Sequence, residues 1–256
     1  MKISIVTGAS SGLGREFVYL LDKHENLDEI WVIARRENRL KELQEQSNSK
    51  IRVLAYDLTE KESFAKLSEL LKEEKPEVAF LINAAGFGKI GSYKDISLED
   101  SEKMIDLNCR AAVAVTQIVI PYMPKKSHIL EICSTSAFQP FQFLDIYAAT
   151  KAFLYRYSRA LRVELFPRHI SVTAVCPYWI RDTEFISTAK RTHNSSYIRN
   201  FPFSSKAKTI AVWAMSDAKL GLPVSTPGPV CILHRISAKF IPHELMMGIW
   251  ALLRRI

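Results

Sequence analysis

Short hydrophobic runs alternate with longer segments of helical periodicity along most of this sequence. Six runs rich in Val and Ile have the length of strands, at residues 2–7, 29–34, 51–56, 78–83, 127–133 and 170–176. They lack polar alternation, which predicts that both of their faces are covered. Helical patterns separate them, at residues 13–23, 37–46, 60–73, 98–123 and 147–166. This repeated order predicts an α/β fold, a doubly wound parallel sheet with helices on both faces.

The regular alternation ends after the sixth run. Residues 183–204 mix aromatic, basic, Ser and Asn residues and predict a mobile helical lid. Prolines crowd residues 222–229, so any last strand there is short. Residues 231–256 predict a C-terminal tail of two short amphipathic helices. At 256 residues, the chain is expected to form a single domain over residues 1–256.

Composition indicates a packed protein in a reducing compartment. Hydrophobic residues make up 48% and charged residues 24% of the chain. The four cysteines, Cys109, Cys133, Cys176 and Cys231, have no Cys-x-x-Cys spacing, which favours buried core residues over metal ligands or disulfides. No segment resembles a secretory signal, and the apolar runs are shorter than the ~20 residues that a membrane-spanning helix needs. We therefore expect a cytoplasmic protein without a metal site.

The net charge of +8 lies entirely in the C-terminal part of the chain. Residues 186–256 carry ten Lys and Arg residues against two acidic ones. This excess could face an acidic substrate, an anionic lipid surface or solvent, and we expect no nucleic-acid partner. In the tail, a helical stripe ends next to two arginines; it comprises Leu245, Met246, Ile249, Trp250 and Leu253, followed by Arg254 and Arg255. Core, subunit-interface and membrane-surface helices share this pattern, so a weak membrane contact stays open.

A glycine-rich turn stands between the first predicted strand and the first helix. It reads Thr7-Gly8-Ala9-Ser10-Ser11-Gly12-Leu13-Gly14. Glycines at this place let a pyrophosphate touch the backbone at a helix N-terminus. The turn therefore predicts a dinucleotide site, with contacts from Gly8, Ser10, Ser11, Gly12, Leu13 and Gly14.

The residues after the second strand indicate which dinucleotide binds. NAD favours an acidic residue about 20 positions beyond the turn. Here Ala34 occupies that place, followed by Arg35 and Arg36. Guanidinium groups favour a 2′-phosphate and hence NADP(H), although the same arginines could simply begin a solvated helix.

Two further strand ends complete the predicted cofactor site. Asp57, beside Leu58, is placed to meet the adenine amino group. The backbone of Asn83-Ala84-Ala85-Gly86, after the fourth strand, is placed to approach the adenosine ribose.

The spacing Tyr-x-x-x-Lys occurs three times and therefore decides little by itself. Pro124 interrupts Tyr122 and Lys126, and Tyr19 and Lys23 lie at the back of the first helix. Tyr147 and Lys151 begin a long helix at the edge where the strands end, and Ser134 precedes Tyr147 by thirteen residues. This third pair is the candidate catalytic site.

These residues resemble the short-chain dehydrogenase/reductase family in its single-domain branch of roughly 250 residues. The likeness covers about the first 180 positions and includes the glycine-rich turn, the Asn-x-Ala-Gly segment and a helical Asn108. It implies a Rossmann-type fold and a catalytic tetrad of Asn108, Ser134, Tyr147 and Lys151. It also implies a homodimer or homotetramer.

A proton-transfer role for Tyr147 also has a physical rationale. A phenol has a reference pKa near 10. An ammonium about 4 Å away is worth about 4 kcal/mol at an effective dielectric of 20, so Lys151 is expected to lower the pKa of Tyr147 to near 7. By resemblance, Lys151 also holds the nicotinamide ribose, Ser134 binds the substrate carbonyl and Asn108 completes a water-linked proton relay.

The sequence departs from the family pattern at two places. Ala84 replaces the second Asn of the usual Asn-Asn-Ala-Gly, which should loosen the site. After the sixth strand, Pro177 is followed by Tyr178-Trp179-Ile180 where the family usually has Pro-Gly. By resemblance, Pro177, Ile180 and Thr183 border the nicotinamide, and Tyr178 and Trp179 either narrow the substrate pocket or pack.

The sequence thus predicts an NADP(H)-dependent oxidoreductase that reduces a ketone or aldehyde to an alcohol, or catalyses the reverse. Two alternatives stay open. One is a non-catalytic NADPH-binding regulatory protein, against which the complete tetrad argues. The other is a reductase of a lipidic carbonyl attached to a membrane surface by its tail.

Overall fold

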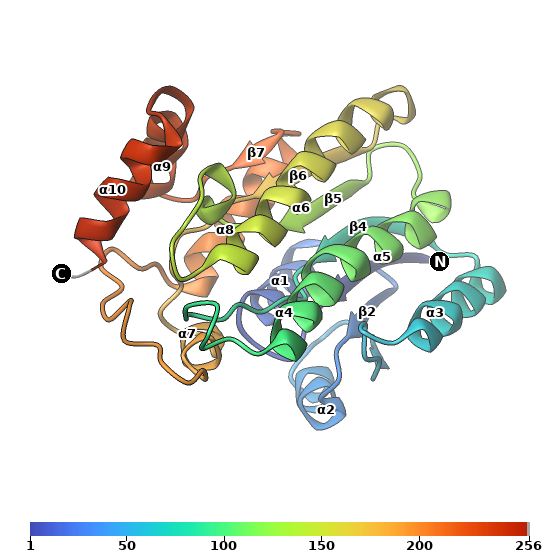
Figure 1. Cartoon of the computed structure of the whole chain (residues 1–256). Helices are drawn as coiled ribbons and strands as arrows, with labels where there is room; N and C mark the ends of the chain where they lie inside the picture. The colour runs from blue at the N-terminus through green and yellow to red at the C-terminus, as the bar shows by residue number, and fades with distance from the viewer. Residues whose placement is uncertain (255–256) are drawn as a thin grey trace.

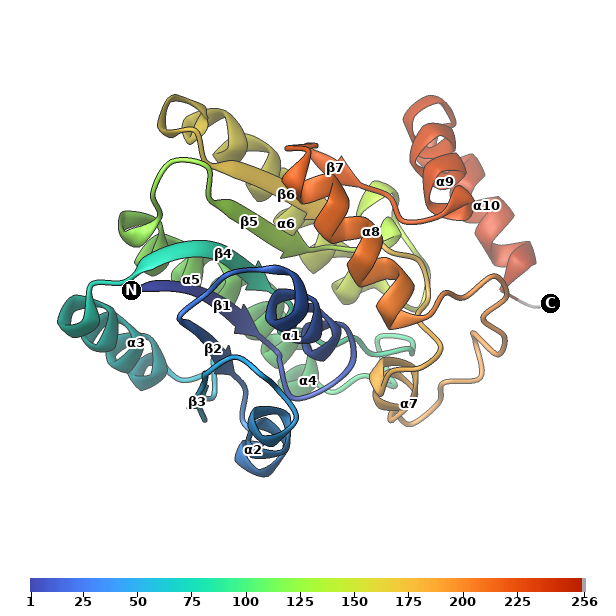
Figure 2. The same cartoon turned by 180° about the vertical axis from the view of Figure 1, so that it is seen from behind.

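The computed structural model describes residues 1–254, and within them seven parallel strands form one twisted sheet (Figures 1 and 2). In space the strands follow the order β3-β2-β1-β4-β5-β6-β7. In chain order they are β1 (Lys2–Thr7), β2 (Glu29–Ile33), β3 (Ile51–Leu54), β4 (Glu77–Asn83), β5 (His128–Ile132), β6 (Ser171–Val175) and β7 (Val224–Ser225). The predicted doubly wound parallel sheet is confirmed.

Helices cover both faces of the sheet (Figures 1 and 2). One face carries α1 (Gly12–His24), α2 (Glu37–Glu45) and α8 (Ala207–Lys219). The other carries α3 (Lys61–Glu74), α4 (Leu98–Ile105), α5 (Ala112–Val119) and α6 (Asp145–Glu164). Three helices lie at the carboxyl-end side or the C-terminus: α7 (Phe185–Ala189), α9 (Pro229–Phe240) and α10 (His243–Leu253).

Alternate residues of each strand pack into the two helix layers on opposite faces of the sheet. Ile30 and Val32 of β2 pack with α1 and α2, whereas Trp31 and Ile33 pack with the layer that contains α3 and α5. All four side chains are fully buried. This is why the strands appear as continuous apolar runs: each side of the pleat meets a helix.

The order in which the chain adds strands to the sheet reverses between β1 and β4, and the site lies at this position. From β1 the chain winds outward to β2 and β3, then returns to β4 on the other side of β1. The connections after β1 and β4 therefore leave in opposite directions and open a crevice at the carboxyl ends of the strands. The glycine-rich turn and the Ala84–Gly86 loop both border this crevice.

Two helical predictions were incomplete. Helix α8 was not predicted, although Ala207, Ile210, Ala211 and Ala214 are buried at helical spacing. This hydrophobic pattern is weak because alanine has a small side chain that contributes little hydrophobicity. The predicted helix 98–123 is helical throughout but contains a π-helical turn, Asp106–Ala111, between α4 and α5.

The segment Leu98–Tyr122 is, among the described residues, the one helix whose length and composition would suffice to cross a membrane. The sequence did not single out this helix, because charged residues interrupt its apolar runs. In the fold, Val115 and Val119 are fully buried and α5 packs on β4 and α3. The helix is this apolar because it is an amphipathic core helix, with charged residues concentrated in its exposed first half.

The tail forms two helices, as expected. Helices α9 and α10 stand at the end of the molecule opposite α3 (Figures 1 and 2). In the predicted lid, helix α7 spans only Phe185–Ala189, and the stretch beyond it is largely irregular. Of the predicted tail stripe, Arg255 and the side chain of Leu253 lie outside the described part of the chain.

Candidate active site

The glycine-rich turn is built so closely that side chains would not fit at its glycines. Gly8 and Gly12 have φ angles of +68° and +53°, which favour glycine. A Cβ on Gly8 would lie 2.7 Å from the backbone nitrogen of Ala85, and one on Gly14 would overlap the carbonyl oxygen of Gly8. The turn thus presents bare backbone at the N-terminus of α1, as a pyrophosphate requires.

A cavity of about 460 Å³ runs along the carboxyl ends of the strands. It brings together most of the predicted site residues, which are Gly8, Ser10, Ser11, Gly12, Leu13, Gly14, Arg35, Arg36, Asp57, Leu58, Ala84, Ala85, Gly86, Ser134, Tyr147, Lys151, Pro177, Ile180 and Thr183. Asn83 and Asn108 do not line it. Residues between Gly8 and Arg191 therefore meet in one cleft of the size of a cofactor and small-ligand site.

Ser134, Tyr147 and Lys151 converge on the floor of this cleft. Tyr147 and Lys151 lie one turn apart near the start of α6, and both are buried. The Lys151 Nζ atom donates a hydrogen bond of 2.7 Å to the carbonyl oxygen of Ile132, at the end of β5. Ser134 lies two residues beyond that strand, and its side chain hydrogen-bonds that of Tyr147. A substrate atom beside Tyr147 would thus also meet the hydroxyl of Ser134.

The expected lowering of the Tyr147 pKa by Lys151 is wrong for the residues as they stand. Burial raises the pKa of Tyr147 far above its ordinary value, and the hydrogen bond with Ser134 opposes this only in part. Burial likewise lowers the pKa of Lys151. The geometry explains the failure: the Lys151 ammonium lies 5.8 Å from the centre of the Tyr147 ring and points to a backbone carbonyl.

Asn108 lies in the π-helical turn and braces the loop after β4. Its Oδ1 accepts a hydrogen bond of 3.0 Å from the backbone nitrogen of Phe87. Its Nδ2 donates to the Phe87 carbonyl oxygen, at 2.9 Å, and to Thr150 on α6. A Cβ on Gly86 would lie 2.8 Å from Asn108 Oδ1 and 3.4 Å from Lys151 Nζ. The π turn therefore places Asn108 behind Gly86, next to Lys151, as π bulges often do at functional sites.

Asn83 lies outside the cofactor cleft, contrary to the prediction. Its side chain turns into the core, where Nδ2 donates to Thr116 Oγ1 at 2.8 Å and to Glu131 Oε1 at 2.9 Å. The prediction failed because Asn83 still belongs to β4, so the pleat directs its side chain to the helix layer. Only the residues that follow it reach the crevice.

Glu131, which was not predicted, is a fully buried carboxyl group beneath the site. It accepts hydrogen bonds from Asn83 and Thr116, while its Oε2 has no partner among the described residues. Burial raises its pKa to about 7, against the ordinary 4.5. A glutamate inside the apolar run Ile-Leu-Glu-Ile was the signal that could have revealed it.

Glu131→Gln is expected to stabilise the protein above neutral pH. The folded state holds the Glu131 proton more tightly than the unfolded chain does, so stability is lost as pH rises between the two pKa values, 4.5 and about 7. The full shift corresponds to about 3 kcal/mol. Glutamine keeps the acceptor for Asn83 and Thr116 and cannot ionise, so we expect the free energy of unfolding near pH 8 to rise by about 1–3 kcal/mol.

Urea unfolding across this pH range measures the effect, and Glu69→Gln on the exposed side of α3 serves as the matched control. A wild-type slope that survives Glu131→Gln would contradict the assignment of this pH dependence to Glu131.

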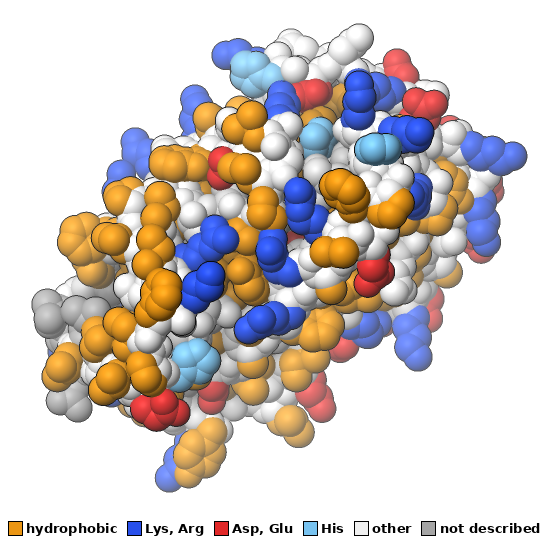
Figure 3. Space-filling model, turned by 90° about the horizontal axis from the view of Figure 1, so that it is seen from above, with side chains coloured by type: hydrophobic (Ala, Val, Ile, Leu, Met, Phe, Trp, Pro, Cys, Tyr) orange, Lys and Arg blue, Asp and Glu red, His pale blue; other side chains and the backbone are white. Residues whose placement is uncertain are grey.

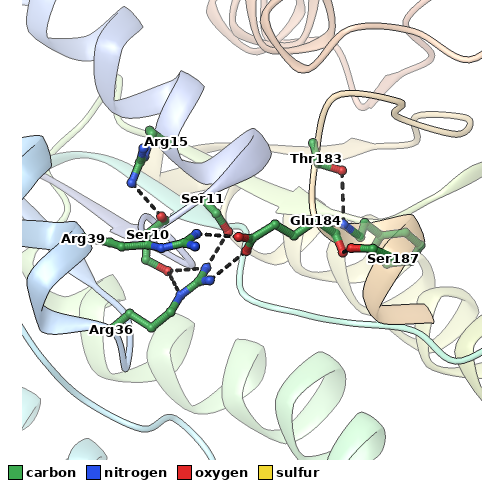
Figure 4. Close-up of polar contacts among 9 residues, drawn as sticks. Ser10, Ser11, Arg15, Arg36, Arg39, Thr183, Glu184 and Ser187 are labelled. Atoms are coloured by element: carbon green, nitrogen blue, oxygen red, sulfur yellow. Dashed lines mark hydrogen bonds and ion pairs between the residues drawn. The ribbon is translucent and has the colours of Figure 1, made fainter. Parts of the chain in front are cut away.

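Arg36 and Arg39 reach across the cleft to Glu184, just before α7 (Figure 4). Arg36 Nη2 donates to Ser11 Oγ at 2.7 Å and to Ser10 Oγ at 3.1 Å, and Nη1 donates to Glu184 Oε2 at 2.7 Å. Arg39 donates to the other Glu184 oxygen at 2.5 Å. These two guanidinium groups lower the pKa of Glu184 to about 2. Neither Arg39 nor Glu184 was predicted, although Arg39 follows Arg36 at helical spacing.

Arg35 and Asp57 lie at the outer end of the cleft. Asp57 Oδ1 accepts hydrogen bonds from the backbone and side chain of Thr59, at 2.9 and 2.7 Å, which hold the carboxylate in place. Its second oxygen lies 3.8 Å from the exposed guanidinium of Arg35. Arg36, rather than Arg35, is therefore the arginine that the fold attaches to the glycine-rich turn.

Aromatic side chains form the walls next to Tyr147. The rings of Tyr147 and Phe185 lie 5.3 Å apart, and Trp179 lies 6.4 Å from Phe185. Phe141 and Leu144, from the loop before α6, complete this part of the cleft. Both Tyr178 and Trp179 line it, and Trp179 also packs edge-on against Phe201, at 4.6 Å. The end of the cavity at Tyr147 is consequently apolar.

The two other Tyr-x-x-x-Lys pairs lie away from the cleft. The hydroxyl of Tyr19, on α1, donates a hydrogen bond to Gln46, which follows α2. Tyr122 ends a 3-10 turn, and Lys126 has a φ of +69°, so these two residues share no helix face.

Comparison with known proteins identifies the family. A model described as short chain dehydrogenase matches residues 2–194. This chain belongs to the short-chain dehydrogenase family. It is therefore an oxidoreductase of a family that binds nicotinamide cofactors.

Individual proteins are similar to this chain in sequence or in fold. An uncharacterized oxidoreductase of Staphylococcus epidermidis is 30% identical over 178 residues, which cover 69% of this chain and 76% of the relative. A short-chain dehydrogenase from Sphingobium yanoikuyae, solved in complex with NADPH, superposes with a TM-score of 0.79 at 26% identity, covering 100% of this chain and 96% of that one. A bulky-bulky ketone specific alcohol dehydrogenase from Comamonas testosteroni shares the fold, with a TM-score of 0.74, 24% identity and coverage of 100% and 95%.

Proposed function

We propose that this protein is an NADP(H)-dependent reductase of a ketone or aldehyde, which also catalyses the reverse alcohol oxidation. The observation that carries the proposal is the single cleft that joins two sets of residues. At one end lie the glycine-rich turn and Arg36, and at the other lie Ser134, Tyr147 and Lys151. The cleft thus has a place for an anionic dinucleotide and, next to it, a hydroxyl group able to exchange a proton.

The residues present fit a nicotinamide dinucleotide. Backbone nitrogens of the turn would hold the pyrophosphate, and Arg36 with the hydroxyl groups of Ser10 and Ser11 would hold a 2′-phosphate. Lys151 would hold the nicotinamide ribose, and Ile180 and Thr183 would contact the carboxamide. When bound, the cofactor supplies or accepts the hydride.

Tyr147 then handles the proton. In the reducing direction the phenol Oη–H bond breaks and the proton passes to the substrate carbonyl oxygen, while the carbonyl carbon gains the hydride. Burial raises the pKa of Tyr147, which keeps the phenol protonated but makes it a weaker acid, so proton transfer depends on the negative charge that develops on the carbonyl oxygen as the hydride arrives. Ser134 would donate a hydrogen bond to the same oxygen. By resemblance to the family, Lys151 and Asn108 would then act through water in returning a proton to the phenolate.

The preference for NADP(H) over NAD(H) follows from charge. No carboxylate stands at the end of β2, where NAD-binding proteins carry one, and Arg36 instead faces two serine hydroxyl groups. The Sphingobium relative, 26% identical, is described in complex with NADPH. A serine dehydrogenase complexed with NADP+, 27% identical with a TM-score of 0.70, points the same way.

The proposal extends to organisation and substrate. Residues 1–256 would act as one domain, with residues 183–204 as a lid over the apolar end of the cleft and residues 231–256 as the tail. The aromatic walls around Tyr147 favour an apolar carbonyl compound. We further infer a cytoplasmic homodimer or homotetramer, as is typical of the family.

A panel of ketones, aldehydes and alcohols, followed by NADPH absorbance, tests the proposed function. We expect turnover of at least one apolar ketone or aldehyde, with kcat/KM rising as the carbonyl compound gains apolar surface. NADH in place of NADPH provides the control for the cofactor. Tight NADPH binding without turnover of any compound in the panel would favour the regulatory alternative.

A further inference from the structure

The outward surface of α9 and α10 carries large hydrophobic side chains in a regular row. On α9 they are Ile232, Ile236 and Phe240, and on α10 they are Leu245, Ile249 and Leu252. Each set recurs at helical spacing, and Phe240, Leu252 and Leu245 are 78%, 68% and 62% exposed. We name these six residues the tail face. Figure 3 shows hydrophobic side chains gathered at this C-terminal end of the molecule, with Lys and Arg beside them.

The inner surfaces of the same helices are already packed. Trp250 is buried, lies 4.9 Å from Phe141 and donates a hydrogen bond to the carbonyl oxygen of Gln142. His234 pairs with Gln139 at 2.9 Å. The tail face is therefore not the surface by which these helices pack on the rest of the protein. It is a second hydrophobic surface on helices whose core-facing side is satisfied, and each of its six side chains is at least 40% exposed.

Cations stand within this hydrophobic row. Arg235 and Lys239 fall three and seven residues after Ile232, on the same side of α9. Neither forms an ion pair or hydrogen bond with any residue that the structure describes. Residues 229–254 contain one carboxylate, Glu244. A helix with hydrophobic side chains flanked by unpaired cations is typical of the interface of an anionic bilayer.

We propose that the tail face docks on an anionic lipid bilayer, and that docking gives the cleft access to apolar carbonyl compounds dissolved in that bilayer. The charge pattern disfavours a second copy, because a twofold pairing of this face would bring the cations of both copies together. A bilayer instead accepts the hydrophobic side chains and places phosphate groups beside Arg235 and Lys239.

The connection from the tail to the active site is direct. Trp250 contacts Phe141, and Phe141 lines the cleft near Tyr147. The loop that walls the apolar end of the cleft is thus held between the tail helices and the cavity. The second half of the proposal, which concerns the substrate, rests on the proposed function, whereas docking itself does not.

Vesicle flotation of the full chain tests docking without any activity measurement. We expect the wild type to float with vesicles of phosphatidylcholine and phosphatidylglycerol, and much less with phosphatidylcholine alone. Ile236→Glu with Leu245→Glu should lower the partition coefficient by more than about a hundredfold. Leu98→Glu with Leu220→Glu, at exposed hydrophobic sites elsewhere, adds the same charge and should float like the wild type.

The cations are tested separately. Arg235→Gln with Lys239→Gln should reduce the partition coefficient by about thirtyfold, since each cation near an anionic surface contributes about one kcal/mol. Lys66→Gln with Lys72→Gln on α3 is the matched control. Thermal unfolding confirms that all variants are folded. Failure of the wild type to float, or equal flotation of tail-face and control variants, would overturn the proposal. A dimer that light scattering detects in every protein except the Ile236→Glu, Leu245→Glu variant would also overturn it.

Kinetics then address the substrate. Anionic vesicles should lower KM for a long-chain ketone with the wild type and not with the tail-face variant, while a water-soluble ketone shows no difference. A vesicle effect that is equal in both proteins would overturn the substrate half of the proposal. Flotation without turnover of any carbonyl compound would leave docking supported and refute the proposed function, so the two failures are distinguishable.

Discussion

Tyr147→Phe is expected to lower kcat for carbonyl reduction by about a hundredfold to ten-thousandfold, the contribution typical of a positioned general acid. The substitution removes one hydroxyl group and keeps the ring, which packs against Phe185 at 5.3 Å and fills the space beside Gly88. The walls of the cleft should therefore survive, and NADPH affinity should change little. Steady-state kinetics with calorimetric titration of NADPH measure both quantities.

Tyr19→Phe is the matched control, because Tyr19 also precedes a lysine by four residues but bonds Gln46 outside the cleft. It should leave kcat unchanged. The proposed mechanism would be refuted by a Tyr147→Phe variant with wild-type turnover. A parallel loss of NADPH affinity would instead mean that the hydroxyl group serves binding.

Arg36→Gln is expected to weaken NADPH binding by about tenfold to a hundredfold, the worth of charge-assisted hydrogen bonds of about 1.5–3 kcal/mol. NADH carries no 2′-phosphate, so its affinity should hardly change. The argument rests on geometry: Arg36 lies within hydrogen-bond distance of Ser10 and Ser11 and is partly exposed. Because the site is open to solvent, added salt should shrink the difference between the two proteins.

Arg39→Gln offers the control for Arg36→Gln. Arg39 belongs to the same cluster and pairs with the same Glu184, yet its bond leads away from the two serines. Its loss should affect NADPH and NADH equally and slightly. An equal loss of both cofactors in Arg36→Gln, measured by calorimetry, would refute selection of the 2′-phosphate by this residue.

Elements with strong periodicity were predictable from the sequence. Strand β2 was expected at residues 29–34 and spans Glu29–Ile33, and α6 was expected at residues 147–166 and spans Asp145–Glu164. Weak or interrupted signals were missed: α8 buries alanines, and the π turn at Asn108 leaves no mark on the hydrophobic pattern. A π turn changes the backbone register by one residue, which hydrophobic spacing does not resolve.

The candidate site divides in the same way. Glycine spacing and Ser134 with Tyr147 and Lys151 could be recognised because their positions along the chain encode their positions at the strand ends. The pKa of Tyr147 could not be predicted in this way. Lys151 points to the carbonyl of Ile132, and burial has the largest effect on the pKa values of both residues. The shift depends on the distance between the two side chains, and only packing sets that distance.

The sequence by itself determined the family, the parallel sheet and the cleft at its carboxyl ends, since hydrophobic period and glycine positions act locally or through strand order. Tertiary structure decided the rest. It turned Asn83 into the core against Glu131, joined Glu184 to Arg36 across the cleft, and left the outer side of α9 and α10 uncovered. Each of these features involves residues that are far apart in the chain. How the helices pack decides whether such residues meet, and neither segment determines this alone.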